Sequence, residues 1–399
     1  MSSESQIPIA SHTSPKRFAT WLALVYATCF GLLGTHLPFF TVWLKAVGVD
    51  AAWIGLITAV PSVTRFSTLP FVTSFAERRQ ALRGGIIVLA FATMIGLAVV
   101  GLQHRTLLIF VAYAVTCCVW TPTVPLIDAY ALRGVRQYGL AYGPLRLWGS
   151  AAFVAGALAC GALIDVFAAR NLIWIIAAMA GLSALVSLGL KPLGPLKTNP
   201  AESRGASGLL RDTGFLAIIV TSALIQSSHS AYYVVASIAW QQEGLGGLTI
   251  ASLWTLGVLA EIVVFALSPR FTLAPAVLVV IAACSAVARW VITALAPPIG
   301  ILAPVQLLHG LSFGLTQVGI MGLMVQHVPS HVMARGQGYL AACSGITASA
   351  AYVLSGVIFA RYGQNVYYVM AALAGSGALV MCLARHRLSD QPHSAASGG

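Results

Sequence analysis

The chain has 399 residues, of which 58% are hydrophobic and only 8% are charged, and its formal net charge is +12. A soluble domain of this size would need far more charge on its surface, so the composition excludes a soluble protein. Continuous apolar runs of about 20 residues instead predict helices that cross a membrane.

Twelve such helices are predicted along the chain. In chain order they cover residues 18–44, 53–76, 84–103, 107–132, 142–166, 171–190, 214–241, 248–267, 274–295, 299–326, 337–360 and 365–384. Six precede and six follow residues 191–213, whose prolines, glycines, serines and mixed charges are typical of an exposed linker. The predicted fold is therefore an all-α membrane protein with two six-helix bundles. The bundles occupy 18–190 and 214–384, between an N-terminal segment, 1–17, and a tail, 385–399.

The basic residues are distributed unevenly between the predicted loops. With a cytoplasmic N-terminus, the inner segments hold 15 Lys and Arg residues and the outer segments hold four. Because cytoplasmic loops carry an excess of positive charge, we expect a bacterial-type inner-membrane protein with both termini and the linker in the cytoplasm. The net positive charge is then a topology signal and not a surface that binds nucleic acid.

Two opposite charges, Asp128 and Arg146, lie within apolar segments on either side of one short basic loop. Each is about five residues from the loop, so at about 1.5 Å per residue both reach the same depth in the membrane. A lone charge there is costly, and such residues usually pair or face a water-filled path. We therefore predict a buried ion pair, either as part of a transport path or as a static pair that fixes helix packing.

Polar side chains recur on one face of several predicted helices. The tenth helix carries Gln306, His309, Ser312 and Thr316, and the seventh carries Ser222, Gln226, His229 and Tyr233. With His36 on the first helix and Asp128 on the fourth, these stripes predict a shared hydrophilic cavity. The alternative is that they form hydrogen bonds between packed helices.

The other charges well inside the predicted helices are Arg65, Arg289 and Glu261, while Asp165 lies near the outer end of the fifth helix. Glu261 shares a face with Trp254, where it could meet an aromatic substrate, or it is a structural partner of Arg289. Arg65 lies between two prolines, and we expect a gating or structural role for it. Three embedded arginines against two carboxylates leave an excess positive charge, which suits a substrate carboxylate.

The loop TSFAERRQALR resembles a degenerate form of the signature loop of the major facilitator superfamily, with Glu77 at its acidic position and Arg78 at its basic position. The segments PLIDAYALRGVRQYGLAYGPLRLWG, QSSHSAYY, LWTLGVLAEIVVF and LLHGLSFG together resemble the phenylpropionate-permease branch. More distantly, they are similar to the oligosaccharide–proton symporters that include lactose permease. The resemblance covers almost the whole chain and implies a transporter.

The resemblance also implies roles for individual residues. Asp128 and Arg146 match the carboxylate and the arginine that bind sugar in lactose permease, and Arg289 and His309 match residues of its proton-coupling region. Ser312 stands where that permease has a carboxylate one helical turn after the histidine. Sugar specificity and the detailed coupling route therefore do not carry over to this chain.

From these observations we expect a monomeric carrier that takes up a small organic solute with protons by alternating access. The favoured solute is an aromatic or other organic acid. We predict neither a cofactor nor a metal site, and the absence of a catalytic motif argues against an enzyme. The alternatives are a sugar or nucleoside symporter, drug or metabolite efflux, and a membrane sensor that does not transport. The predicted substrate-binding residues are Asp128, Arg146, His229, Tyr233 and Trp254. The predicted proton-coupling residues are Glu261, Arg289 and His309, and the predicted gating or structural residues are Arg65, Glu77 and Arg78.

Overall fold

A computed structural model describes residues 14–79, 81–140, 142–193, 206–328 and 333–389. Within these ranges the secondary structure is helical, without a strand. The first group of helices is α1 (Pro15–Ala46), α2 (Ala51–Ser67), α3 (Leu69–Arg78), α4 (Leu82–Gly101), α5 (Thr106–Trp120), α6 (Thr123–Tyr138), α7 (Tyr142–Ile164) and α8 (Leu172–Ser187). The second is α9 (Thr213–Ser227), α10 (Ser230–Gln242), α11 (Gly247–Leu267), α12 (Pro275–Ala294), α13 (Ile299–His309), α14 (Thr316–His327), α15 (Met333–Tyr362) and α16 (Val366–Ser389). The π-helical segment η4 (Gly310–Leu315) joins α13 to α14.

Ten helical stretches in the described part of the chain are long and apolar enough to cross a membrane. One of them, Gly336–Arg385, has 50 residues and includes most of both α15 and α16. The consecutive helices α2 and α3 are not among the ten. The all-helical membrane fold predicted from the sequence is therefore confirmed.

Several predicted helices are interrupted, and local chemistry explains the breaks. The predicted helix 107–132 divides into α5 and α6 at Pro122, whose ring nitrogen has no N–H to continue the helical hydrogen bonds. The predicted helix 214–241 divides into α9 and α10 at a serine-rich step, where the Ser228 hydroxyl donates to the Ile225 carbonyl at 2.6 Å. The chain is helical on both sides of each break, and residues 227–230 at the second break are buried.

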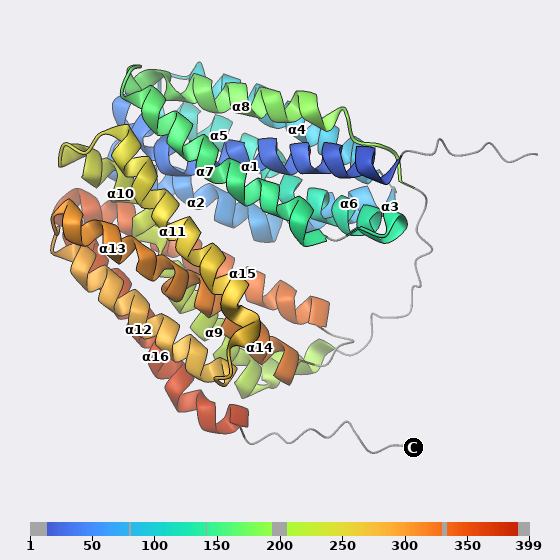
Figure 1. Ribbon diagram of the computed structural model, residues 1–399. Helices are drawn as coiled ribbons and strands as arrows, with labels where there is room; N and C mark the ends of the chain where they lie inside the picture. Colours follow the sequence, from blue (N-terminus) through green and yellow to red (C-terminus); the bar gives the residue numbers. More distant parts are fainter. Residues whose placement is uncertain (1–13, 80, 141, 194–205, 329–332, 390–399) are drawn as a thin grey trace, which may run out of the picture.

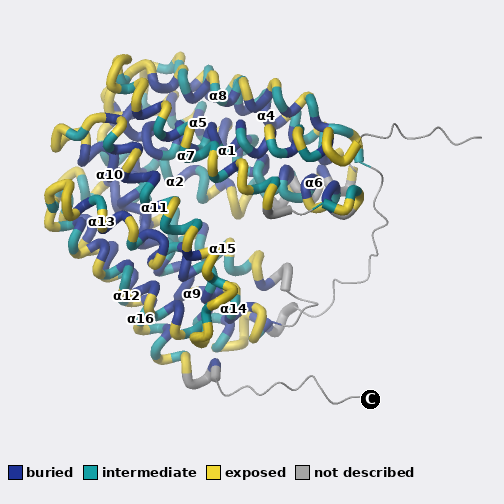
Figure 2. The backbone as a smooth tube through the Cα atoms, viewed as in Figure 1, coloured by how far each residue is buried: buried dark blue, intermediate teal, exposed yellow. Residues whose placement is uncertain are grey.

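The helices form two groups that diverge from a shared end (Figure 1). Helices α1–α8 lie in the upper part of the view and α9–α16 in the lower part, and they meet at the left. The beginning of α1 and the end of α8 lie toward the opposite end. Figure 2 shows buried residues within each group and at the shared end, and exposed residues along the outer rims. Exposed apolar side chains such as Val88, Ile95 and Leu185 are expected of helices that face lipid.

At the shared end the two groups touch through backbone. A Cβ atom on Gly161 of α7 would lie 2.6 Å from the Gly247 carbonyl oxygen of α11, and one on Gly55 of α2 would lie 2.7 Å from the Tyr352 carbonyl oxygen of α15. These glycines leave no room for a side chain, so α7 packs closely on α11 and α2 on α15. We refer to this region below as the closed end.

Candidate functional site

Asp128 and Arg146 are brought together by an aromatic side chain from the first helix. The Tyr26 hydroxyl of α1 donates a hydrogen bond of 2.6 Å to Asp128 Oδ1 on α6. The Arg146 guanidinium carbon, on α7, lies 3.8 Å from the centroid of the Phe30 ring and 5.5 Å from that of Tyr26. Aromatic faces attract a cation at such distances. Tyr26 therefore contacts the carboxylate through its hydroxyl and the guanidinium through its ring.

The direct ion pair predicted between Asp128 and Arg146 is not observed. Among the described side chains, the salt-bridge contact within 4.0 Å joins His309 to Glu261. Instead, Tyr26 of α1 contacts both residues, and the depth of the charges in the sequence did not reveal this side chain. Gly149 makes this geometry possible, since a Cβ there would lie 2.9 Å from Arg146 Nη1 and 3.0 Å from Phe30 Cδ2.

A second polar cluster lies around Arg289 in the other group of helices. Arg289, on α12, is fully buried, and its guanidinium donates to His309 Nδ1 at 2.8 Å and to Gln306 Oε1 at 3.0 Å. The same guanidinium lies 4.5 Å from the ring centroids of both Tyr232 and Trp290. This buried cation is therefore held by two neutral acceptors from α13 and by aromatic faces.

The hydrogen bond from Arg289 fixes where His309 carries its proton. A guanidinium only donates, so Nδ1 of His309 must accept, and the ring proton is on Nε2. That Nε2 lies 3.8 Å from Glu261 Oε2 on α11. His309 thus stands between Glu261 and Arg289. In place of the direct Glu261–Arg289 contact considered from the sequence, both side chains contact His309.

Two glycines near His309 allow the helices to pack closely enough for the contact between His309 and Glu261. A Cβ on Gly310 would lie 2.5 Å from the Ala260 carbonyl oxygen, and one on Gly257 would lie 3.3 Å from His309 Cβ. These glycines let α11 approach α13 and the π-helical segment η4, and that approach places Glu261 beside His309. A π-helical segment inside an α-helix is frequent at functional sites.

His229 extends the cluster toward Ser312. Its Nδ1 lies 3.1 Å from the Ile225 carbonyl oxygen, which only accepts, so this nitrogen carries the proton. Its Nε2 then accepts from the Ser312 hydroxyl at 3.2 Å. The predicted polar stripes of the seventh and tenth segments therefore meet, and both histidines have hydrogen-bond partners.

The two clusters lie on either side of the boundary between the helix groups. Arg146 is on α7 and Glu261 is on α11, and these two helices pack against each other. Arg146 is half-buried and the Glu261 side chain is 23% exposed, so a solute could reach both. Arg289, fully buried, lies deeper than these two.

The remaining predicted residues lie in different settings. Trp254 is almost fully buried, with its indole N–H donating to Ser237 at 2.9 Å, and its ring centroid lies 5.9 Å from that of Tyr233. Arg65 is exposed on α2. Glu77 and Arg78 are in α3, but their side chains lie outside the described part of the structure.

Sequence reasoning missed Tyr26 and Phe30, the aromatic residues that hold Arg146. Their spacing of four residues on the first helix places them on one face, a signal that the search for polar stripes overlooked. That search selected His36, which instead lies in a buried aromatic cluster, with Nε2 3.1 Å from the Tyr113 hydroxyl. In the described residues, no group of three or more His, Cys, Asp or Glu side chains is arranged to hold a metal ion.

Comparison with known proteins identifies the class to which this fold and site belong. Residues 19–370 match the model of the MFS_1 like family. The chain is 32% identical over 369 residues to the probable 3-phenylpropionic acid transporter of Escherichia coli (strain K12), covering 89% of this chain and 94% of that protein. It is 26% identical over 377 residues to maltose permease of Geobacillus stearothermophilus, covering 92% and 95% of the two chains.

A solved structure supports the same fold. The nucleoside transporter NupG superimposes with a TM-score of 0.80 over 92% of this chain and 99% of that chain, at 15% sequence identity. The protein is therefore an integral membrane transporter and not an enzyme. It belongs to the MFS_1 like family, so the resemblance to major facilitator transporters, and to the phenylpropionate-permease branch among them, is confirmed.

Proposed function

We propose that this transporter takes up a small organic acid together with a proton, and that the preferred acid carries an aromatic ring. The observation that carries the proposal is Arg146, a partly accessible cation packed against the Phe30 and Tyr26 rings, with Tyr26 also bonded to Asp128. A guanidinium binds a carboxylate through two parallel hydrogen bonds. The aromatic faces next to it offer a surface on which the ring of the substrate would stack.

The similarity to the 3-phenylpropionic acid transporter supports the same substrate class. Substrate contacts are proposed for Asp128, Arg146 and Tyr233. His229 and Trp254 are assigned a supporting role because both are buried with hydrogen bonds to neighbouring serines. A sugar or nucleoside is the runner-up cargo, favoured by the similarity to maltose permease and by the fold shared with a nucleoside transporter.

Proton coupling is proposed for Glu261 and His309, with Arg289 holding the histidine in place. The carboxylate faces the ring nitrogen that carries the proton, and Arg146 would attract this carboxylate across the boundary between the helix groups. A substrate carboxylate that binds Arg146 would weaken that interaction and leave Glu261 freer to hold a proton. Binding and protonation would then favour each other, which is what symport requires.

The proposed architecture is the twelve-helix plan, with bundles at 18–190 and 214–384 that rock against each other. The closed end would face outward, and the end where α1 begins would face the cytoplasm, as the distribution of basic residues predicts. We further propose that the transporter works as a monomer in a bacterial-type inner membrane and does not bind nucleic acid. Residues 1–13, 194–205 and 390–399 of the proposed cytoplasmic segments lie outside the described residues.

Uptake into proteoliposomes tests the proposal. Purified protein would be supplied with labelled 3-phenylpropionate, maltose or uridine, with and without an inwardly directed proton gradient. The proposal expects accumulation of the aromatic acid that depends on the gradient. Gradient-driven accumulation of maltose or uridine alone would favour the runner-up, and expulsion from loaded vesicles alone would favour efflux.

A further inference from the structure

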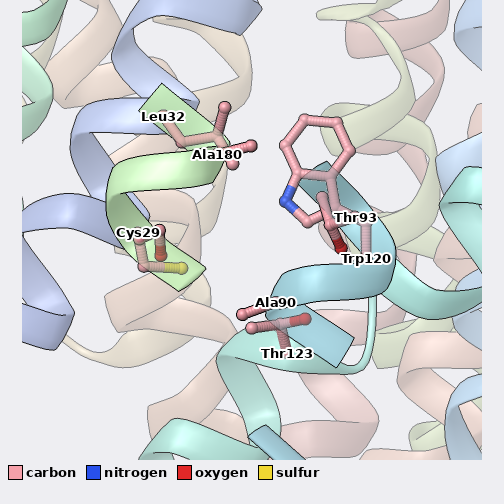
Figure 3. A pocket seen from close by; sticks show the side chains of 8 residues that line it. Cys29, Leu32, Ala90, Thr93, Trp120, Thr123 and Ala180 are labelled. Atoms are coloured by element: carbon pink, nitrogen blue, oxygen red, sulfur yellow. The ribbon is translucent and has the colours of Figure 1, made fainter. Parts of the chain in front are cut away.

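A small cavity lies within the first helix group, behind the Asp128–Tyr26–Arg146 cluster. It has a volume of about 10 Å³ and is lined by Cys29 and Leu32 of α1, Ala90 and Thr93 of α4, Trp120 of α5, Thr123 of α6, and Ala180 and Ser183 of α8. Cys29 lies three residues after Tyr26 on α1, which places the cavity close to the substrate cluster. Figure 3 shows the indole nitrogen of Trp120 facing the space between this ring and Cys29.

Two polar side chains that line the cavity lack a hydrogen-bond partner among the described residues. Trp120 and Ser183 are each only 7% exposed, and the indole N–H and the Ser183 hydroxyl keep some accessible surface without a hydrogen bond to another described residue. The hydroxyls of Thr93 and Thr123 donate to carbonyls of their own helices, so both can still accept. Polar groups that line a cavity and have no protein partner are satisfied by water where the cavity can hold it.

We infer that this cavity is a binding site for one resident water molecule. The water accepts from the Trp120 indole and exchanges hydrogen bonds with the Ser183 and threonine hydroxyls. It joins α4, α5, α6 and α8, beside Cys29 of α1, which lies three residues after Tyr26. The inference does not depend on the identity of the transported solute.

Radiolytic footprinting of the full-length protein tests this site, because hydroxyl radicals formed from a bound water oxidise the side chains beside it. Trp290 and Cys160 are the matched controls. Both are fully buried, and the Trp290 indole already donates to Ser228. We expect oxidation of Trp120 and Cys29 to exceed that of the controls several-fold, and Ser183→Val to bring Trp120 down to the level of Trp290. Equal oxidation of Trp120 and Trp290 in the unmodified protein, or unchanged oxidation in Ser183→Val, would overturn the inference.

A second inference comes from Asp165, at the closed end. Asp165 follows the last residue of α7 in one helix group and accepts hydrogen bonds from the first two backbone N–H groups of α11 in the other. The distances are 2.6 Å to Gly247 and 3.2 Å to Leu248. The residue before α11, Gly246, makes no side-chain cap. The N-terminus of α11 is therefore capped by a residue of the opposite helix group.

The charge of Asp165 suits α11 and not its own helix. A carboxylate at a helix C-terminus meets the negative end of the helix dipole, whereas at an N-terminus it meets the positive end and free N–H groups. Separation of the groups would leave Asp165 at the unfavourable end of α7 and would leave the α11 N–H groups to water. The close approach of Gly161 to Gly247 lies one turn away.

We propose that Asp165 is a latch that stabilises the state in which this end is closed. Spin labels attached through bio-orthogonal amino acids at His104 and Ala296, one in each group at this end, would report the separation without substrate. We expect Asp165→Ala to increase the open fraction several-fold. Asp50→Ala is the matched control, because Asp50 caps α2 within its own group by accepting from the Trp53 N–H at 3.0 Å.

The outcomes separate a latch from general loss of stability. An open fraction that rises in Asp165→Ala and stays at the starting level in Asp50→Ala supports the latch. Unchanged distances in Asp165→Ala, or an equal rise in both variants, would overturn it. Because the distances are measured without substrate or a proton gradient, a wrong assignment of cargo or coupling would leave this test unaffected.

Discussion

The Arg146 guanidinium lies 3.8 Å from the centroid of the Phe30 ring, with Gly149 leaving the space that this approach needs. This relationship distinguishes Arg146 from Arg289, whose guanidinium is fully buried and already hydrogen-bonded to His309 and Gln306. Arg146 is the more accessible of the two cations, and aromatic faces hold it without using all of its N–H donors. It is therefore suited to receive an anion.

Replacement of Arg146 by lysine should abolish efficient uptake while the fold survives. Lysine keeps the charge but loses the planar pair of donors, and loss of a charge-assisted hydrogen bond of about 1.5–3 kcal/mol corresponds to roughly a 10- to 100-fold loss of affinity. Substrate binding and thermal stability would be measured on the purified variant, with the exposed Arg105→Lys as control. If Arg146→Lys fails to fold and neutralising Asp128 restores folding, the two residues are a static pair.

Two substitutions should distinguish the roles of the two ring nitrogens of His309. Asparagine places an acceptor near the position of Nδ1 and can keep the bond from Arg289, whereas glutamine reaches toward the position of Nε2. We expect His309→Asn to retain stability but lose proton-driven accumulation. His309→Gln leaves a buried guanidinium donor without its acceptor and should destabilise the protein by about 1–3 kcal/mol. Equal thermal stability of the two variants would contradict the assigned tautomer.

Glu261→Gln should prevent accumulation against a gradient yet preserve exchange of substrate between loaded compartments. Exchange requires only that the loaded carrier reorient, whereas net uptake requires the carboxylate to gain and lose a proton. Labelled-substrate accumulation and counterflow in the same proteoliposomes distinguish the two processes. Normal gradient-driven accumulation by Glu261→Gln would remove Glu261 from the mechanism and leave Asp128 or His309 as the proton carrier.

The orientation in the membrane can be tested with reporter fusions. A reporter placed after Lys197 should be cytoplasmic and one placed after His104 should lie outside, because 15 basic residues fall on one side and four on the other. Localisation of both reporters on the same side would contradict the twelve-helix topology.

Much of the fold was predictable because membrane-spanning helices are long apolar runs, and the helical character of those runs is confirmed. The helix breaks at Pro122 and Ser228 and the π-helical segment after His309 were not predicted. Hydropathy averages over a whole segment, whereas these features depend on single prolines, serines and glycines. The close contact between Gly161 and Gly247 was likewise not predicted, since it depends on how two helices that are far apart in the sequence pack together.

The sequence predicted which residues form the candidate site, but it predicted only partly which of them contact one another. Buried charge and polar stripes selected Asp128, Arg146, Arg289 and His309, all of which lie in the two clusters. The partners were different, since Tyr26 contacts both of the first two and His309 stands between Glu261 and Arg289. The four-residue spacing of Tyr26 and Phe30 shows that they share a helix face, but that they contact Arg146 becomes visible only in three dimensions.

Proton movement driven by substrate tests the central claim most directly. Proteoliposomes containing a trapped pH-sensitive dye would receive 3-phenylpropionate at alkaline pH, with protein-free liposomes correcting for passive entry of the undissociated acid. The account predicts acidification of the lumen beyond this control, in step with substrate uptake, and its loss in both Arg146→Lys and Glu261→Gln. Substrate uptake by the unmodified protein without acidification beyond the control would contradict proton-coupled transport through this site.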